Sequence, residues 1–169
     1  MRVAVTVAAA LVSVLVFAGC VSTSGSSGSR DELYSTVSQL SANSALVVVG
    51  RVTLQDNVDD PQATVVSTIE VGERFVTAGL GNGLPGGTPI PDKIGGVLQV
   101  RQVTKPYLET GQSYLLFLVP SGLPGEAGGQ YFVTGANAGM YHVEGTNFVH
   151  GDFTEGDTLP GTLTRADLG

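Results

Sequence analysis

The chain has 169 residues, enough for one ordinary domain with extensions and too few for two full domains. Charged residues make up 14% of it, against about a quarter in typical soluble domains, and its 24 glycines are about twice the usual share. The formal net charge of −7 argues against electrostatic binding to nucleic acid or to anionic lipid headgroups. The single cysteine, Cys20, excludes an internal disulfide.

A strongly apolar run follows the first two residues. Met1-Arg2 gives a short basic start. Residues 3–17 are then almost wholly apolar, and the small residues Ala18 and Gly19 follow. The run is shorter than the roughly 20 residues that a membrane-spanning helix needs, and its form is typical of an export signal that is later removed. A plain secretory signal cleaved near Ala18 and an uncleaved anchor are the alternatives that this pattern leaves open.

The sequence Phe-Ala-Gly-Cys at 17–20 resembles the lipobox of bacterial lipoproteins, whose usual form is Leu-(Ala/Ser)-(Gly/Ala)-Cys. Three positions match, and Phe17 replaces the commoner leucine. The resemblance implies that residues 1–19 are a signal peptide and that Cys20 becomes a lipidated N-terminal residue carrying a diacylglycerol thioether. Two acyl chains exceed the marginal membrane binding of a single chain. We therefore expect a protein attached by lipid to the cell membrane and facing away from the cytoplasm.

Residues 21–29 consist almost entirely of Ser, Gly and Thr. This composition predicts a flexible coil, and about nine such residues span on the order of 16 Å root-mean-square. We interpret residues 20–29 as a tether that holds a folded domain away from a membrane. A terminus without any role is the alternative, and it predicts the same lack of order.

The folded part is expected to begin with a short helix. Residues 29–32, Ser-Arg-Asp-Glu, have the S-x-x-E form of a capping box. Leu33, Val37 and Leu40 follow at helical spacing and form one apolar stripe. The pattern predicts a packing helix that ends at about Ser41.

From residue 45 onward the period changes to that of β-strands. The expected strands cover residues 45–54, 63–71, 96–103, 113–119, 130–135 and 139–145. In the first strand, alternation places Leu54 on the same face as Leu46, Val48 and Val52. The last two strands are joined by the turn-rich Ala-Asn-Ala-Gly and are expected to form a hairpin.

These elements predict one all-β domain over residues 30–150. Five or six antiparallel strands with one short N-terminal helix are typical of a small closed or nearly closed barrel, similar to the OB fold. Residues 151–169 have weak periodicity and are expected to form a C-terminal extension that wraps loosely on the barrel.

Three stretches resemble the netrin-like module, which also forms the tissue inhibitors of metalloproteinases. They are SALVVVGRVT at 44–53, LETGQSYLLFL at 108–118 and YFVTGANAGMYHV at 131–143. The resemblance spans roughly residues 44–145 and implies an OB-type barrel.

The resemblance does not carry metalloproteinase inhibition with it. Animal members of that family are disulfide-rich, whereas this chain has one cysteine. The inhibitors chelate the protease zinc through a free amino-terminal cysteine beside the barrel. Here Cys20 is expected to be acylated, and a tether and a helix separate it from the first strand.

Two long connections are rich in Gly and Pro, at residues 79–96 and 120–129. Loops of this length are either functional or simply mobile, and mobility is the simpler interpretation. If the domain binds a ligand, we expect these loops to contribute, because rigid scaffolds usually recognise through loops. The candidate ligand residues are Gly79, Asn82, Pro85, Asp92, Lys93, Gly122 and Glu126.

The sequence offers little for catalysis. Residues 81–86 match G-x-G-x-x-G, but Pro85 and the sequence after it exclude the helix start that dinucleotide binding needs. His142 and His150 are the only histidines, and His142 is expected to face solvent or a neighbouring strand. Acidic residues at 56–60 and 152–157 offer oxygen ligands for a cation such as Ca²⁺, but without EF-hand spacing.

We therefore expect no catalytic, metal-binding or cofactor-binding residues. The predicted function is a non-catalytic binding module at the cell envelope, anchored through Cys20, with a protein or small ligand as partner and no nucleic acid. The alternatives are a structural envelope protein and an envelope hydrolase or metal-dependent enzyme. The enzyme would require His142 or His150 to converge with acidic loop residues.

Overall fold

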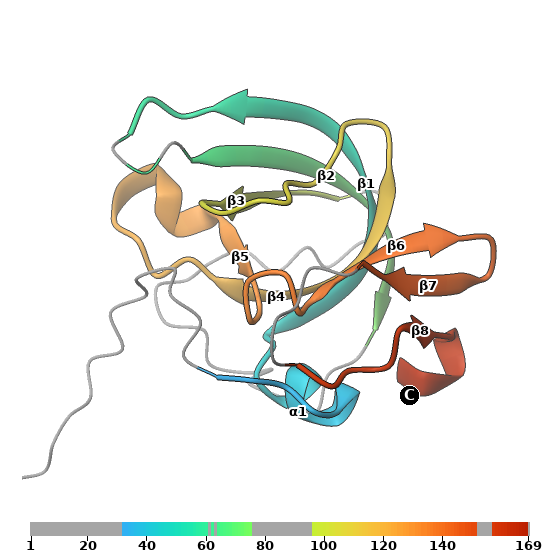
Figure 1. Ribbon diagram of the computed structural model, residues 1–169. Coiled ribbons are helices and arrows are strands. Elements are labelled where there is room, and N and C mark those ends of the chain that lie inside the picture. The colour runs from blue at the N-terminus through green and yellow to red at the C-terminus, as the bar shows by residue number, and fades with distance from the viewer. Residues whose placement is uncertain (1–31, 61, 63, 76–95, 152–156, 169) are drawn as a thin grey trace, which may run out of the picture.

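The computed structural model describes residues 32–60, 62, 64–75, 96–151 and 157–168 (Figure 1). In chain order its elements are α1 (Val37–Ala42), β1 (Leu46–Asn57), β2 (Val65–Phe75), β3 (Val97–Gln102), β4 (Ser113–Pro120), the 3₁₀-helix η1 (Gly125–Gly129), β5 (Tyr131–Val133), β6 (Met140–Glu144), β7 (Asn147–His150), β8 (Thr162–Leu163) and the 3₁₀-helix η2 (Arg165–Leu168). The expected signal peptide, Cys20 and the tether lie outside the described residues, as do the loop residues Gly79, Asn82, Pro85, Asp92 and Lys93.

Five strands close into a barrel, which confirms the prediction of a small all-β, OB-like domain. The ring runs β1–β2–β3–β5–β4, and β4 pairs again with β1. The neighbouring strands are antiparallel except β3 and β5, which are parallel. The expectation of a wholly antiparallel barrel is therefore wrong. An odd number of strands cannot alternate in direction around a closed ring, so one neighbouring pair has to be parallel.

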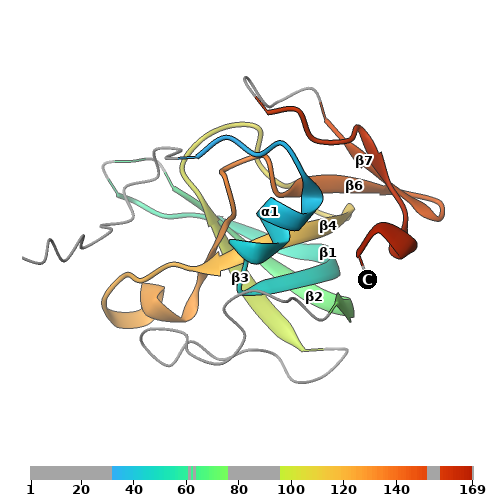
Figure 2. The same ribbon diagram turned by 90° about the horizontal axis from the view of Figure 1, so that it is seen from below.

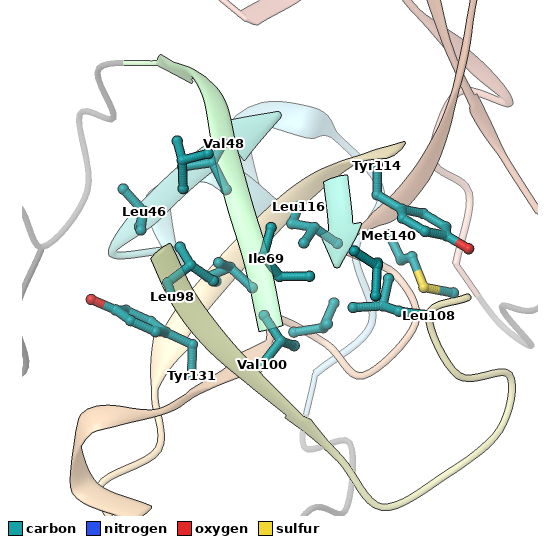
Figure 3. Packing of buried hydrophobic residues seen from close by; sticks show 14 residues of the cluster. Leu46, Val48, Ile69, Leu98, Val100, Leu108, Tyr114, Leu116, Tyr131 and Met140 are labelled. Atoms are coloured by element: carbon teal, nitrogen blue, oxygen red, sulfur yellow. The ribbon is translucent and has the colours of Figure 1, made fainter. Parts of the chain in front are cut away.

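The barrel interior is filled by an inner cluster of buried side chains (Figure 3). Ile69 of β2 lies near its middle, and Tyr114 and Tyr131 lie toward opposite sides of it. Its members are Leu46, Val48, Val52, Ile69, Val71, Leu98, Val100, Leu108, Tyr114, Leu116, Leu118, Tyr131, Val133 and Met140. Alternate residues of β1 and β4 supply much of this cluster, as the period of two in a strand requires.

An outer cluster of buried side chains covers the other face of β1 and β4, on the side of the barrel where α1 lies in Figure 2. It explains why these strands are apolar on both faces, because α1 and the C-terminal residues pack against the barrel wall there. Its buried members are Tyr34, Leu40, Val47, Leu115, Phe117, Ala138, Tyr141, Phe148 and Leu163. Leu159 and Leu168 also pack against it, so the C-terminal extension lies closer to the domain than the loose wrapping expected from the sequence.

The helix begins later than its capping pattern predicts. Thr36 is the N-cap, and its side chain accepts a hydrogen bond from the Gln39 N–H at 3.2 Å. The Gln39 side chain in turn accepts from the Ser35 N–H at 3.2 Å. The cap resembles a T-x-x-Q capping box, except that the Gln39 side chain accepts from Ser35 rather than from the N–H of the N-cap Thr36. Leu33, expected on the apolar stripe, precedes this cap and is 60% exposed.

A β-bulge changes the face on which Leu54 lies. The pairing register of β1 with β2 shifts between Val52 and Leu54, opposite Ile69 and Thr68. An extra residue in a strand reverses the alternation of all the side chains that follow it. Leu54 is therefore 52% exposed, and its predicted place beside Val52 in the interior is wrong.

The expected hairpin of residues 130–135 and 139–145 does not form. β5 and β6 instead lie end to end along one edge of β4, where Leu118 pairs with Val133 and Leu116 pairs with Met140. The turn between them arches over Phe117, whose N–H donates to the Gly139 carbonyl at 2.9 Å. The hairpin partner of β6 is β7. A turn does join the two strands, as their sequence predicts. However, both strands pair with β4 and not with each other.

Candidate functional site

The two candidate ligand residues that the structure describes lie on the connection between β4 and β5. Gly122 and Glu126 are both exposed, and Gly122 has a positive φ of 64°. The connection is closed at its base by a hydrogen bond from the Ser121 N–H to the Gln130 carbonyl, at 2.9 Å. It is thus an ordered loop built around η1, at the same end of the barrel as the β1–β2 turn (Figure 1).

A network of polar side chains joins this connection to the β1–β2 turn across the outer side of β3. Arg101 donates from Nη2 to Asp60 Oδ2 at 3.1 Å and from Nη1 to Gln130 Oε1 at 3.4 Å. Gln130 Nε2 donates to Gln99 Oε1 at 3.2 Å. We call Asp60, Gln99, Arg101 and Gln130 the polar network. Its ion pair is largely shielded, since the side chains of Arg101 and Asp60 are only 11% and 22% exposed.

Asp60 also organises the turn that carries it. Its Oδ1 accepts hydrogen bonds from the N–H groups of Gln62 and Thr64, both at 3.1 Å. The Thr64 side chain, these N–H groups and the Arg101 guanidinium favour the ionised carboxylate against the opposing effect of desolvation. They hold the pKa of Asp60 below its ordinary value of 3.8.

Replacing Asp60 by asparagine is expected to lower stability at neutral pH by an amount that disappears in acid. Because the folded-state pKa is depressed, the carboxylate contributes its stability in full above 3.8, and this is lost as the pH falls through the lower folded-state value. Urea unfolding of wild type and Asp60→Asn from neutral pH to below 3.8 measures the difference. Asp59→Asn, at the exposed neighbouring position, is the control. A difference between Asp60→Asn and wild type that stays constant over the series would contradict the assignment.

The other end of the barrel is closed by the connection between β3 and β4. Leu108 inserts into the inner cluster, and its N–H donates to Gln102 Oε1 at 2.9 Å. Gln55 donates to the Leu108 carbonyl from the opposite side. The Tyr114 hydroxyl accepts from the Glu109 N–H at 3.1 Å, and burial raises the pKa of Tyr114. With the interior packed and closed by Leu108, recognition by the described residues has to use the outer surface.

The histidines are held by aromatic neighbours. The His142 ring lies 4.7 Å from the ring of Tyr114 on the neighbouring strand β4, the second of the two orientations that the sequence left open. The His150 ring lies 4.5 Å from that of Tyr141, and its Nε2 is 3.1 Å from the Ala138 carbonyl. Burial raises the pKa of Tyr141 to about 12.

Metal-ligand geometry does not emerge from the part of the chain that the structure describes. Within it, no three His, Cys, Asp or Glu residues lie close enough together to hold a metal ion. Of the acidic residues at 152–157, Asp152 and Glu155 lie outside that part, and Asp157 Oδ1 accepts a hydrogen bond from the Tyr34 N–H.

The polar network was not predicted from the sequence. The sequence places Asp60 in an acidic turn and Arg101 on the outward face of a strand, but the two are 41 positions apart. Their pairing depends on how the β1–β2 turn folds over β3. The outward position of Arg101 was the one available signal, because a lone arginine on a strand face often pairs with an acid.

Comparison with known proteins adds no relative to this description. No protein-family model matches the chain, and no curated protein matches it either. Among the helices that the structure describes, none has the length and apolar character to cross a membrane.

Proposed function

We propose that the protein is an exported lipoprotein whose OB-like barrel acts as a non-catalytic binding module at the cell envelope. The observation that carries the proposal is the position of Cys20. It stands at the end of a short apolar run and completes a Phe-Ala-Gly-Cys sequence similar to the lipobox. Lipidation also accounts for an unpaired cysteine in an oxidising compartment. The anchor is then hydrophobic, because the net charge of the chain is negative.

Two features of the outer surface of the barrel support the binding role. Its interior is packed with side chains, and its ordered outer features are the polar network and the connection that carries Gly122 and Glu126. We propose that this end of the barrel contacts an envelope protein or a small ligand. The loop residues between 79 and 93 are a separate candidate, because their connection leaves β2 at Phe75 and not at the β1–β2 turn. No nucleic acid and no cofactor are part of the proposal.

We further propose kinship with the netrin-like module. The three resembling stretches contribute to β1, β4, β5 and β6, so they occupy core positions of one barrel. Metalloproteinase inhibition is not included, because an acylated Cys20 lacks the free amino-terminal chelating group.

The anchor is tested by comparing wild type with Cys20→Ala in a bacterial host. Wild type is expected to partition into the detergent phase and to have an N-terminal peptide that starts at residue 20 and carries acyl mass. Cys20→Ala is expected to lose the acyl mass and the cleavage before residue 20 together. Ser24→Ala, which changes the tether alone, is the matched control and should behave as wild type. Wild-type protein without acyl mass at Cys20 would reject the proposal, whatever its partition.

The binding surface is tested separately by crosslinking in cells. A photo-reactive residue placed at Glu126 is expected to give a specific adduct. The same residue at Glu144, which is also exposed but lies on the β6–β7 hairpin, should give none. Equal labelling from both positions would count against recognition at the η1 end of the barrel.

A further inference from the structure

The two segments that flank the barrel in the sequence meet on one side of it. Residues 32–44 include α1, and residues 157–168 include β8 and η2; both lie on the same side in Figure 2. The Tyr34 N–H donates to Asp157 Oδ1 at 2.7 Å, across 123 positions of sequence. The Thr158 N–H donates to the Tyr34 carbonyl at 3.1 Å. We call residues 32–44 and 157–168 together the terminal clasp.

The barrel core is complete without the clasp. Every member of the inner cluster lies between Leu46 and Met140, so none belongs to either clasp segment. The barrel ladder also begins after the first segment, where the Ala45 N–H donates to the Leu118 carbonyl at 2.8 Å. Loss of the clasp would therefore leave the ring of five strands and its packed interior in place.

Neither half of the clasp is stable alone. α1 has six residues and β8 has two, far below the roughly 12 residues at which an isolated helix becomes even marginally stable in water. Both halves are held by burying side chains in the same outer cluster, where Leu40 and Leu163 are 0% and 2% exposed. The halves therefore share one apolar surface as well as the two hydrogen bonds at Tyr34.

The clasp is also attached directly to the rest of the sheet. β8 pairs antiparallel with β7, and the His150 N–H donates to the Gly161 carbonyl at 2.9 Å. Arg165 pairs with Glu73 at 3.0 Å, but both side chains are more than a third exposed, and such a pair contributes little. Ser44 Oγ lies 2.8 Å from Thr134 Oγ1 at the end of the first segment. These contacts, like most of the outer cluster, join each half to the rest of the sheet, whereas the two hydrogen bonds at Tyr34 join the halves directly to each other.

We propose that residues 32–44 and 157–168 open and close as one cooperative unit on a barrel that stays folded. Opening exposes the outer cluster, including Phe117, Tyr141 and Phe148, and closing restores the buried state. Opening has one consequence that rests on the function proposed above. If Cys20 is the anchor, opening adds residues 32–44 to the connection between the membrane and the barrel. The opening itself does not depend on lipidation.

Native-state hydrogen exchange of the purified full-length protein in mild detergent tests the proposal. The Asn43 amide reports the first half through its bond to the Gln39 carbonyl, and the His150 amide reports the second half through its bond to the Gly161 carbonyl. We expect both to show the same opening free energy and the same dependence on denaturant. The Val52 and Phe117 amides, which bond within the barrel, are expected to exchange only through global unfolding.

Two variants make the test sharper. Asp157→Ala removes the acceptor of the Tyr34 N–H, and it should accelerate exchange at Asn43 and in β8 on the order of tenfold without changing the Val52 amide. Asp167→Ala removes an acceptor that contacts Thr164 within the second segment. It too should accelerate exchange at Asn43, since both halves open together. Glu126→Ala, on η1 and outside the clasp, is the control.

Three results would overturn the proposal. One is a wild-type protein in which the Asn43 and His150 amides open with different free energies, and this result needs no variant to fold. Another is an effect of Asp167→Ala confined to residues 158–168 and the His150 amide. The third is an equal acceleration of clasp and barrel amides in both variants, which would mean that the clasp opens only when the whole domain unfolds.

Discussion

Replacing Gly50 by alanine is expected to destabilise the barrel by about 2–3 kcal/mol. A Cβ at this position would lie 2.4 Å from Ile69 Cγ2 and 2.9 Å from the Glu70 carbonyl oxygen. Ile69 is fully buried in the inner cluster and the carbonyl belongs to the backbone of β2, so neither neighbour can move cheaply. The midpoint of urea unfolding, monitored by circular dichroism, measures the loss.

Gly72→Ala is the matched control for this effect. Gly72 lies in β2, the strand that pairs with β1, and the nearest atom to an added Cβ is the Val49 carbonyl oxygen at 3.6 Å, an ordinary contact. This variant is expected to stay within about 1 kcal/mol of wild type, because alanine also reduces the conformational freedom of the unfolded chain. Similar losses in both variants would show that close approach is not the reason for glycine at position 50.

Leucines 46 and 54 are expected to differ sharply on truncation although both belong to β1. Leu46→Ala should cost about 2–5 kcal/mol, because Leu46 is 1% exposed and contributes to the inner cluster. Leu54→Ala should stay within about 0.5 kcal/mol of wild type, since Leu54 is 52% exposed. Denaturant unfolding of the two variants under one set of conditions provides the comparison.

The leucine pair also tests the β-bulge directly. Simple alternation gives positions 46 and 54 the same face, and only the register shift after Val52 separates them. A large loss in Leu54→Ala would mean that the bulge is absent in solution. The contrast between the variants is therefore more informative than either value alone.

The sequence predicted some parts of the candidate site and not others. Gly122 and Glu126 could be selected from the sequence because Gly- and Pro-rich connections carry a local signal. The polar network could not, because the Asp60–Arg101 contact depends on where the β1–β2 turn lies relative to β3. For His142 the sequence left solvent and a neighbouring strand open, and only the structure places its ring against Tyr114.

The sequence by itself determined the features that depend on local pattern. Runs that alternate between apolar and polar residues, or are apolar on both faces, predicted the strands of the barrel. The strongly apolar residues 113–119 predicted a strand buried on both faces. The Phe-Ala-Gly-Cys sequence at 17–20 is likewise a local signal, and it alone motivates the proposed anchor. The hydrophobic period and short motifs can be recognised in the sequence because each is defined by residues close together in the chain.

Only the tertiary structure decided which strands meet. Closing an odd number of strands made β3 and β5 parallel, a bulge turned Leu54 to solvent, and β4 took both β5 and β6 along one edge. The joining of Tyr34 to Asp157 is a contact of the same kind. Each depends on groups far apart in the chain, whose approach is set by ring closure and by the burial of two apolar clusters rather than by neighbouring residues.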